Sequence, residues 1–335
     1  MKTEKQPDMN YSVLMSVYDK EKPEFLFAAM QSIFNQTAKT DDFILVFDGP
    51  LTADLDTTVE EMASLHPELH VIRLEKNCGL GTALNVGMRH CRYELVARMD
   101  SDDISRPDRC EKQLNMFLKN PELSIVSGTV EEFASSPDQV EAKRILPEKQ
   151  VDIVEFAKKR NPFNHPCVMY KKSAVEAVGG YQDFYLLEDY YLWVRMLQNG
   201  AKGYNIQEPL LWMRAGSDMY KRRAGWRYAQ SQKALFKYMK DSSFVNQEQY
   251  LKSVVIRTAS SVMPNWLFLA SAFSRILHFY FTTNTMEPIL SSRSARSVAG
   301  RVWKKMESLS MIAGRRTGMH RESRMRLVVH IFSGS

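Results

Sequence analysis

The stretch Leu95-Val-Ala-Arg-Met-Asp-Ser-Asp-Asp103 decides how the rest of the chain is interpreted. An apolar strand runs directly into three carboxylates within four residues, at Asp100, Asp102 and Asp103. Carboxylates this close repel one another, so holding them together costs free energy unless a cation lies among them. Open α/β sheets bind ligands at the carboxyl ends of their strands. Taken alone, the acidic tip is either a solvated turn or a cation site, and the surrounding sequence has to decide.

Apolar runs alternate with amphipathic segments through the first 130 residues. The predicted strands are 11–18, 42–48, 69–74, 94–99 and 123–130, and the predicted helices are 23–35, 51–65, 79–91 and 107–118. This alternation predicts βαβ units on a mostly parallel sheet flanked by helices. The acidic tip therefore follows the fourth strand of an α/β domain.

Beyond about residue 135 the alternation is less regular. The predicted strands are 140–146, 168–170, 204–206 and 210–213, and the predicted helices are 151–159, 173–178, 187–199 and 226–239. Apolar residues recur at helical spacing from 262 to 281, but the longest uncharged stretch has only 17 residues, which disfavours a spanning helix. This segment is either a core helix or an amphipathic helix on a membrane surface. We predict one domain at 1–240 and a helical, basic C-terminal region at 241–335.

The composition is that of a soluble globular protein, with 44% hydrophobic and 25% charged residues. The net charge of +6 is uneven, because ten Lys/Arg against two Glu in 293–326 give this tail +8 and leave about −2 elsewhere. A basic tail suits anionic lipid or nucleic acid, or is simply solvated; we expect no nucleic-acid partner. Residues 1–10 lack the apolar segment of a signal peptide. The four cysteines form no Cys-x-x-Cys pair, which predicts reduced thiols in a cytosolic protein.

The acidic tip does not fit a calcium loop of the EF-hand type. If Asp100 were position 1 of that loop, position 5 would be Ile104 and the glycine position would be Ser105. A divalent ion held by one or two carboxylates, with open positions for phosphate oxygens, fits the sequence better.

Two further segments lie near predicted strand ends. Asp48 follows the second strand, where a carboxylate commonly accepts hydrogen bonds from a base or ribose, although an aspartate before Gly49 is also a common turn residue. The stretch 77–87 resembles a dinucleotide fingerprint but has Leu84 where the third glycine belongs. Its glycines are better explained by a tight strand-to-helix turn.

Three segments in the second half carry other candidate groups. Glu188 and Asp189 begin a predicted helix, where they serve either as a cap or as a general base. His165 stands in a proline-containing loop as a ligand, a base or a structural residue. The run Lys221-Arg222-Arg223 is either solvated or a clamp for a diphosphate.

Taken in order, these pieces resemble the glycosyltransferases of family 2, which have the GT-A fold. The resemblance rests on Ser12-Val-Leu-Met-Ser-Val-Tyr18, Val46-Phe-Asp-Gly49, Asn77-x-Gly79, Leu84-Asn85-x-Gly87, Arg98-Met-Asp-Ser-Asp-Asp103, His165-Pro166, Gly179-Gly180-Tyr181 and Glu188-Asp189. It covers about residues 11 to 238 and is strongest toward bacterial enzymes that build capsule, exopolysaccharide or O-antigen. It implies a GT-A sheet with a C-terminal helical extension.

The resemblance also implies roles for individual residues. The residues expected to bind the nucleotide are Val17, Asp19, Asp48, Asn77, Asp100, Arg222 and Arg223. Among them, Asp48 would hold the uracil. Asp100 and Asp102 form the Asp-x-Asp signature that binds Mn²⁺ or Mg²⁺. Those expected near the donor or acceptor sugar are Asp103, His165, Gly180, Tyr181 and Glu188. Asp189 matches the catalytic base of a single displacement that inverts the anomeric centre.

The implied reaction transfers one hexose, with galactose favoured, from a UDP-sugar to an undecaprenyl-diphosphate-linked saccharide. The chain has no Gln-x-x-Arg-Trp stretch of the kind found in processive synthases, so we expect one sugar per acceptor. The resemblance places the protein peripherally on the inner face of the cytoplasmic membrane. A sugar nucleotidyltransferase is one alternative, although the segment 18–22 lacks the glycine-rich, arginine-containing loop of that class. A catalytically inactive protein that binds sugar nucleotides is the other.

Overall fold

The computed structural model describes residues 9–215 and 225–262. Residues 1–258 belong to one compact unit and 259–335 to another. The domain boundary predicted at 240 stays a prediction. Three features of the sequence lie outside the described residues. They are the arginines at 222 and 223, the apolar segment 262–281 beyond its first residue, and the basic tail.

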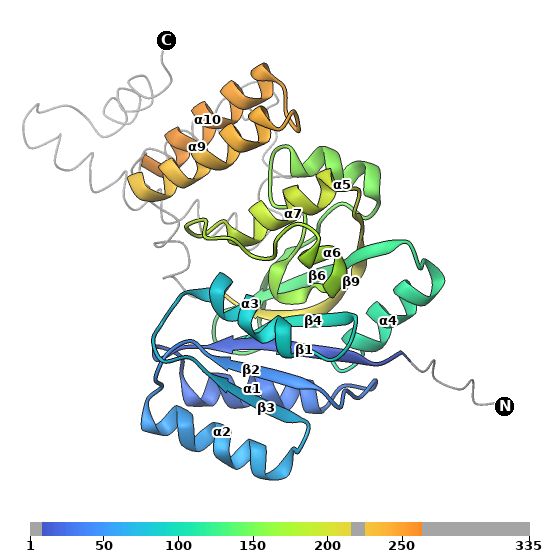
Figure 1. Cartoon of the computed structure of the whole chain (residues 1–335), viewed down its shortest axis with the longest axis vertical. Coiled ribbons are helices and arrows are strands. Elements are labelled where there is room, and N and C mark those ends of the chain that lie inside the picture. The colour runs from blue at the N-terminus through green and yellow to red at the C-terminus, as the bar shows by residue number, and fades with distance from the viewer. Residues whose placement is uncertain (1–8, 216–224, 263–335) are drawn as a thin grey trace, which may run out of the picture. The chain divides into compact units, whose positions relative to one another are not determined.

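Residues 11–119 fold largely as the alternation predicted (Figure 1). The strands are β1 (Tyr11–Val17), β2 (Phe43–Phe47), β3 (Leu69–Arg73) and β4 (Leu95–Asp100), and the helices are α1 (Pro23–Phe34), α2 (Ala53–Leu65), α3 (Leu80–His90) and α4 (Arg109–Lys119). β1, β2 and β4 are short, largely apolar runs that are almost fully buried, as interior strands of a parallel sheet are, whereas β3 at the end of the strand order is mostly half-buried or exposed.

The second part of the chain adds shorter elements. They are β5 (Ile104–Ser105), β6 (Leu123–Phe133), β7 (Val140–Arg144), α5 (Gln150–Ala157), the 3₁₀ turn η1 (His165–Cys167), β8 (Met169–Lys171), α6 (Lys172–Glu176), α7 (Glu188–Gln198), β9 (Lys202–Arg214), α9 (Trp226–Asp241) and α10 (Gln247–Val262). The pattern did not predict the two-residue strand β5 or the helix α10.

All of these strands form one sheet, in the order β3-β2-β1-β4-β8-β6-β9-β5, with β7 paired to β6. β1 pairs in parallel with β2 and β4, and β2 pairs in parallel with β3, which confirms the βαβ prediction. β8 is inserted antiparallel between β4 and β6, whereas β6 and β9 are parallel to each other. The sheet is therefore parallel in its first half and mixed in its second half.

The two short strands expected at 204–206 and 210–213 are one continuous strand, β9, so this detail of the prediction was wrong. Pro209 lacks an N–H and normally interrupts a strand ladder. Here the register between β6 and β9 shifts where Thr129 pairs with Pro209. The neighbouring Gly128 has room for Leu210 because it carries no side chain; a Cβ there would lie 2.5 Å from Leu210 Cδ1. The bulge keeps the strand intact.

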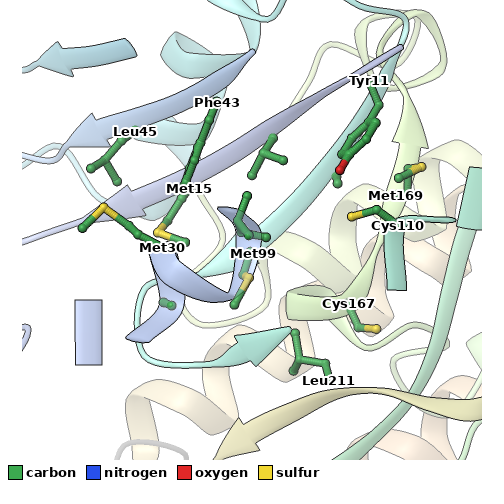
Figure 2. Packing of buried hydrophobic residues seen from close by; sticks show 14 of the residues in the cluster. Tyr11, Met15, Met30, Phe43, Leu45, Met99, Cys110, Cys167, Met169 and Leu211 are labelled. Atoms are coloured by element: carbon green, nitrogen blue, oxygen red, sulfur yellow. The ribbon is translucent and has the colours of Figure 1, made fainter. Parts of the chain in front are cut away.

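Helices cover both faces of the sheet. One face packs against α1, α2 and α4, and Figure 2 shows part of this layer, in which Met30 of α1 lies among side chains of the sheet. The other face packs against α3, α5 and α7, with the fully buried Trp193 of α7 as its largest side chain. Burial of a side chain of this size contributes about 1.5–3 kcal/mol or more, so α7 is firmly attached to the sheet.

The helices α9 and α10 extend the fold beyond α7. Tyr190 and Val194 of α7 form a third buried cluster with Phe236 of α9, and Val245 closes it. Between α9 and α10, the Arg257 Nη1 group donates a hydrogen bond of 2.9 Å to Gln232 Oε1. The C-terminal helical extension that the family resemblance implied is thus present through residue 262.

The sheet places the predicted nucleotide residues at one edge. Ser16 of β1 pairs with Asp100 of β4, and Val17 pairs with Phe47 of β2. The Asp48 N–H then donates to the Val17 carbonyl at 2.8 Å. The chain enters β1 from the right of Figure 1, so the carboxyl ends of these parallel strands face left. The acidic tip therefore lies beside the ends of β1 and β2.

Candidate active site

The three aspartates of the acidic tip form a compact cluster. One carboxylate oxygen from each of Asp100, Asp102 and Asp103 lies within 4.8 Å of the others. Asp103 is buried; its Oδ1 accepts the Arg214 N–H at 2.8 Å, and its Oδ2 has no hydrogen-bond partner among the described residues. A crowded set of oxygen ligands with an unsatisfied buried acceptor fits a hard divalent cation.

Electrostatics support the same conclusion. Burial, followed by repulsion from Asp100 and Glu21, raises the pKa of Asp102 to about 7. Burial and the charge of Asp102 raise the pKa of Asp103 well above its ordinary value. A divalent cation among these oxygens would offset the repulsion, and its binding would displace protons.

A buried arginine supports the cluster from within the sheet. The Arg98 guanidinium on β4 donates from Nη2 to Asp100 Oδ1, which leaves the other Asp100 oxygen for a ligand. The carbonyl of Arg98 accepts a 2.7 Å hydrogen bond from Arg109 Nη2, which also contacts the Val168 carbonyl at 3.2 Å. The sequence offered a signal for Arg98, since a cation in a buried strand requires a partner.

Two other residues that the sequence did not single out hold the tip in place. Arg214 Nε donates to the Asp102 carbonyl at 3.1 Å, and its guanidinium lies over the ring of Phe25 at 3.7 Å. Glu21, in the loop after β1, accepts a 2.6 Å hydrogen bond from the Ser101 hydroxyl. Glu21 thus adds a fourth carboxylate beside the cluster. Nothing in its sequence context marked it.

Asp48 and Gly49 hold the turn that precedes α3. The Asp48 carboxylate accepts the N–H groups of Cys78 at 2.6 Å and Gly79 at 3.0 Å. Gly49 has φ +93°, and a Cβ there would lie 2.6 Å from the backbone nitrogen of Asn77, so only glycine fits. Gly79, with φ +85°, is the N-cap residue directly before α3, as the strand-to-helix turn required. The predicted residues Asp48 and Asn77 are therefore neighbours.

The start of α7 carries the second acidic pair. Leu187 occupies the N-cap position and Glu188 and Asp189 are the first two helical residues, so neither carboxylate is the capping residue. Asp189 Oδ2 accepts a 2.6 Å hydrogen bond from Asn161 Nδ2, and Oδ1 accepts the Tyr190 N–H at 2.6 Å. Two fixed donors orient this carboxylate.

Glu188 and Asp189 are both half-buried. Burial and the Asp189 charge raise the pKa of Glu188 to about 7, and its Oε2 has no hydrogen-bond partner among the described residues. The positive charge of Arg98 lowers the pKa of Glu188 and so partly offsets this rise. A Cβ on Gly81 would lie 4.0 Å from Glu188 Cβ, so the start of α3 closely approaches the start of α7. Arg98 thus connects the metal end of the site to the α7 end.

His165, Gly180 and Tyr181 lie together behind this pair. His165 Nε2 is 2.9 Å from the Tyr181 hydroxyl, and burial followed by the charge of Arg98 lowers the His165 pKa well below its usual value, so the imidazole is neutral. Asn85 donates to the Tyr181 carbonyl at 2.6 Å and accepts its N–H at 2.8 Å. Gly180 has φ +66°, and a Cβ there would lie 2.6 Å from Asn85 Oδ1.

Of the remaining predicted residues, Asp19 is exposed in the loop after β1, and the arginines at 222 and 223 lie outside the described residues. The structure therefore brings together Val17, Asp48 and Asn77 at one edge and the three aspartates beside them. An α/β sheet with a carboxylate cluster after its fourth strand and helices on both faces agrees with the GT-A class of glycosyltransferases that the sequence predicted.

The chain belongs to glycosyltransferase family 2, because the model described as "Glycosyl transferase family 2" matches residues 12–179. It is 40% identical over 259 residues to the amylovoran biosynthesis glycosyltransferase AmsE of Erwinia amylovora, covering 76% of this chain and 94% of AmsE. It is 38% identical over 255 residues to the UDP-Gal:alpha-D-GlcNAc-diphosphoundecaprenol beta-1,3-galactosyltransferase of Escherichia coli, covering 76% of this chain and 92% of that enzyme.

A solved structure supports the fold. The mannosyltransferase PcManGT from Pyrobaculum calidifontis, in complex with GDP-Man and Mn²⁺, superposes with a TM-score of 0.55 at 14% identity and covers 97% of this chain and 84% of that protein. This likeness concerns the fold alone. The GT-A class inferred from the sequence is confirmed, and the chain is a glycosyltransferase of a family whose relatives act in polysaccharide biosynthesis.

Proposed function

We propose that the chain transfers one hexose, with galactose favoured, from a UDP-sugar to a lipid-diphosphate-linked saccharide in surface polysaccharide synthesis. The observation that carries this proposal is the cluster of Asp100, Asp102 and Asp103 at the carboxyl end of β4. The donor and acceptor classes are taken from the galactosyltransferase relative, whose name specifies UDP-Gal and a diphosphoundecaprenol-linked acceptor.

The nucleotide would bind along the ends of β1 and β2. Each Asp48 oxygen accepts one backbone N–H and keeps a lone pair, so the carboxylate can accept the uracil N–H as well. Val17, Asp19 and Asn77 would complete the nucleotide pocket. Arg222 and Arg223 would bind the diphosphate as a cationic clamp.

Asp100 and Asp102 would hold Mn²⁺ or Mg²⁺, with Asp103 beside the donor sugar. When bound, the cation stabilises the negative charge that develops on the leaving diphosphate. The contribution of the chain is orientation: Arg98 fixes one oxygen of Asp100, and Arg214 fixes the backbone of Asp102 and one oxygen of Asp103. Rigid ligands need little rearrangement when the donor binds.

Asp189 would act as the general base. It takes the proton of the attacking acceptor hydroxyl, the hydroxyl oxygen bonds to the anomeric carbon, and the bond to the diphosphate oxygen breaks with its electron pair on UDP. A single displacement inverts the anomeric centre, so a UDP-α-sugar gives a β-linkage. General-base catalysis contributes about 10²–10⁴-fold. Glu188, His165, Gly180 and Tyr181 would shape the pocket for the two sugars around this carboxylate.

A lipid-linked acceptor cannot leave the bilayer, so we infer that the chain works at the inner face of the cytoplasmic membrane. The amphipathic segment 262–281 and the basic tail 293–326 would bind the surface through apolar burial and attraction to anionic lipids. Within residues 9–215 and 225–262, no helix has the length and apolar character needed to cross a membrane.

A donor panel with a synthetic lipid-diphosphate saccharide tests the proposal. We expect UDP release and a product one hexose longer, with UDP-galactose the best donor and a β-linkage visible in the anomeric proton coupling. The Asp102→Ala variant should abolish both. Binding of UDP-sugars without turnover on any acceptor would instead indicate an inactive binding protein, and release of diphosphate from a nucleoside triphosphate would indicate a nucleotidyltransferase.

A further inference from the structure

Two exposed aromatic residues belong to segments that meet near the start of α7, the turn before α7 and the start of α9, which contact each other through Arg227 and Ser231. Tyr185 is 36% exposed and Trp226, the first residue of α9, is 62% exposed. Tyr185 lies four residues before Asp189, so their Cα atoms are at most about 14 Å apart. Tryptophan is highly buried on average, and exposed aromatic groups near a site commonly mark a binding surface.

The turn that presents Tyr185 is fixed by contacts on both sides. The Tyr185 carbonyl accepts a 2.8 Å hydrogen bond from the Ser231 hydroxyl of α9, and the Leu187 N–H donates to the Phe184 carbonyl at 2.8 Å. Leu186 has φ +57°, a left-handed conformation that a leucine rarely adopts. Such strain persists where the surroundings impose it, often at binding sites. The turn therefore holds the Tyr185 side chain in one position next to α9.

Arg227 follows Trp226 in α9 and contacts Tyr185. Its guanidinium carbon lies 3.9 Å from the centre of the Tyr185 ring, and the side chain is exposed. Among the described residues, no carboxylate pairs with it. A guanidinium stacked on a ring keeps the N–H groups at its edge free for an anion, and its planar fork matches phosphate oxygens.

We propose that Tyr185, Trp226 and Arg227 form a subsite for the acceptor. The two aromatic rings stack against the C–H face of its pyranose ring, and Arg227 binds oxygens of the diphosphate that carries this sugar. The inference rests on the proposed function, because a general base at Asp189 must come within about 2.6–3.2 Å of the acceptor hydroxyl. That requirement places the acceptor sugar against the start of α7, which Tyr185 precedes by three residues and near which Arg227 contacts the Tyr185 ring.

Steady-state kinetics with two acceptors test the subsite. One acceptor is a synthetic lipid-diphosphate saccharide, and the other is the same saccharide as a simple glycoside without phosphate. Y185A and W226A should each raise the KM for both acceptors about 3- to 10-fold. R227Q should raise it only for the diphosphate acceptor. The KM for the UDP-sugar should stay unchanged, and Y185F and W226F, which retain an aromatic ring, should restore the wild-type values.

Leu65→Ala is the matched control, because Leu65 is an apolar side chain on α2 that is 73% exposed. If the acceptor KM of Y185A and W226A equals that of L65A while wild-type transfer is intact, the subsite is wrong and the proposed function stands. A rise in the KM for the UDP-sugar instead of the acceptor also overturns the subsite. Failure of the proposed function looks different: the wild-type chain then binds the UDP-sugar but releases no UDP with either acceptor, which overturns both.

Discussion

Glu188→Gln should stabilise the protein at alkaline pH and leave it unchanged at acidic pH. Glu188 is largely buried, and burial and the Asp189 charge raise its pKa from 4.5 to about 7. At about 1.4 kcal/mol per pKa unit, ionising this carboxyl in the folded chain costs at most about 3.5 kcal/mol. Glutamine keeps the shape of the side chain and removes the charge. The variant therefore measures that cost directly.

The sign of the effect follows from the direction of the shift. Because the folded chain holds the Glu188 proton more tightly than the unfolded chain, the wild type loses stability as pH rises from 4.5 toward 7. At pH 4 the carboxyl is protonated in the folded chain and mostly protonated in the unfolded chain, so the wild type and the variant should melt close together. At pH 8 the variant should melt about 6–10 °C higher.

Thermal unfolding followed by circular dichroism between pH 4 and pH 8, without metal or nucleotide, is the assay. Glu60→Gln, at an exposed position on α2, is the matched control and should shift the melting temperature little at any pH. A difference between Glu188→Gln and the wild type that is the same at pH 4 and pH 8 would refute the reasoning, because it could not come from ionisation of this carboxyl.

Two further predictions concern packing and the base. Gly87→Ala should destabilise the fold by about 1–3 kcal/mol, because the added Cβ would lie 2.4 Å from Leu14 Cδ1. Thermal unfolding measures this loss. The control is Thr82→Ala, at an exposed position on the same helix, which should be tolerated. Asn161→Ala should lower kcat about tenfold with little change in the KM for the UDP-sugar, because Asn161 orients Asp189. An unchanged kcat for Asn161→Ala would contradict the role of Asn161 in orienting Asp189.

The first half of the fold and the position of the acidic tip were predictable because they depend on local patterns. Apolar runs and helical spacing determined the βαβ units, and the parallel topology then placed Asp48 and Asp100 at one edge. The continuous strand β9 was not predicted because polar residues and Pro209 separate its two apolar halves, and only the pairing with β6 shows that a register shift accommodates the proline. In this segment, pairing with the neighbouring strand outweighed the local conformational preference of the residues.

The groups that support the site were less predictable because they come from distant parts of the chain. Arg214 donates to Asp103 across 111 residues, and Asn161 donates to Asp189 across 28. Neither pair lies in a motif that a single sequence displays. Arg98 did carry a local signal, because it is a charged residue inside an apolar strand. Its hydrogen-bond partner Asp100 lies only two residues further along the chain. A rule that every buried cation needs a named partner would have identified it.

The most direct test of the central claim separates the metal end of the site from the base. Asp102→Asn and Asp189→Asn are compared with the wild type by calorimetry of UDP binding with and without Mn²⁺, and by UDP release in the presence of a lipid-diphosphate acceptor. We predict that Asp102→Asn loses the Mn²⁺-dependent part of UDP binding, whereas Asp189→Asn binds UDP and Mn²⁺ like the wild type but releases UDP at least about 100-fold more slowly. Turnover of Asp189→Asn close to the wild-type rate, or Mn²⁺-dependent UDP binding that survives in Asp102→Asn, would contradict the account.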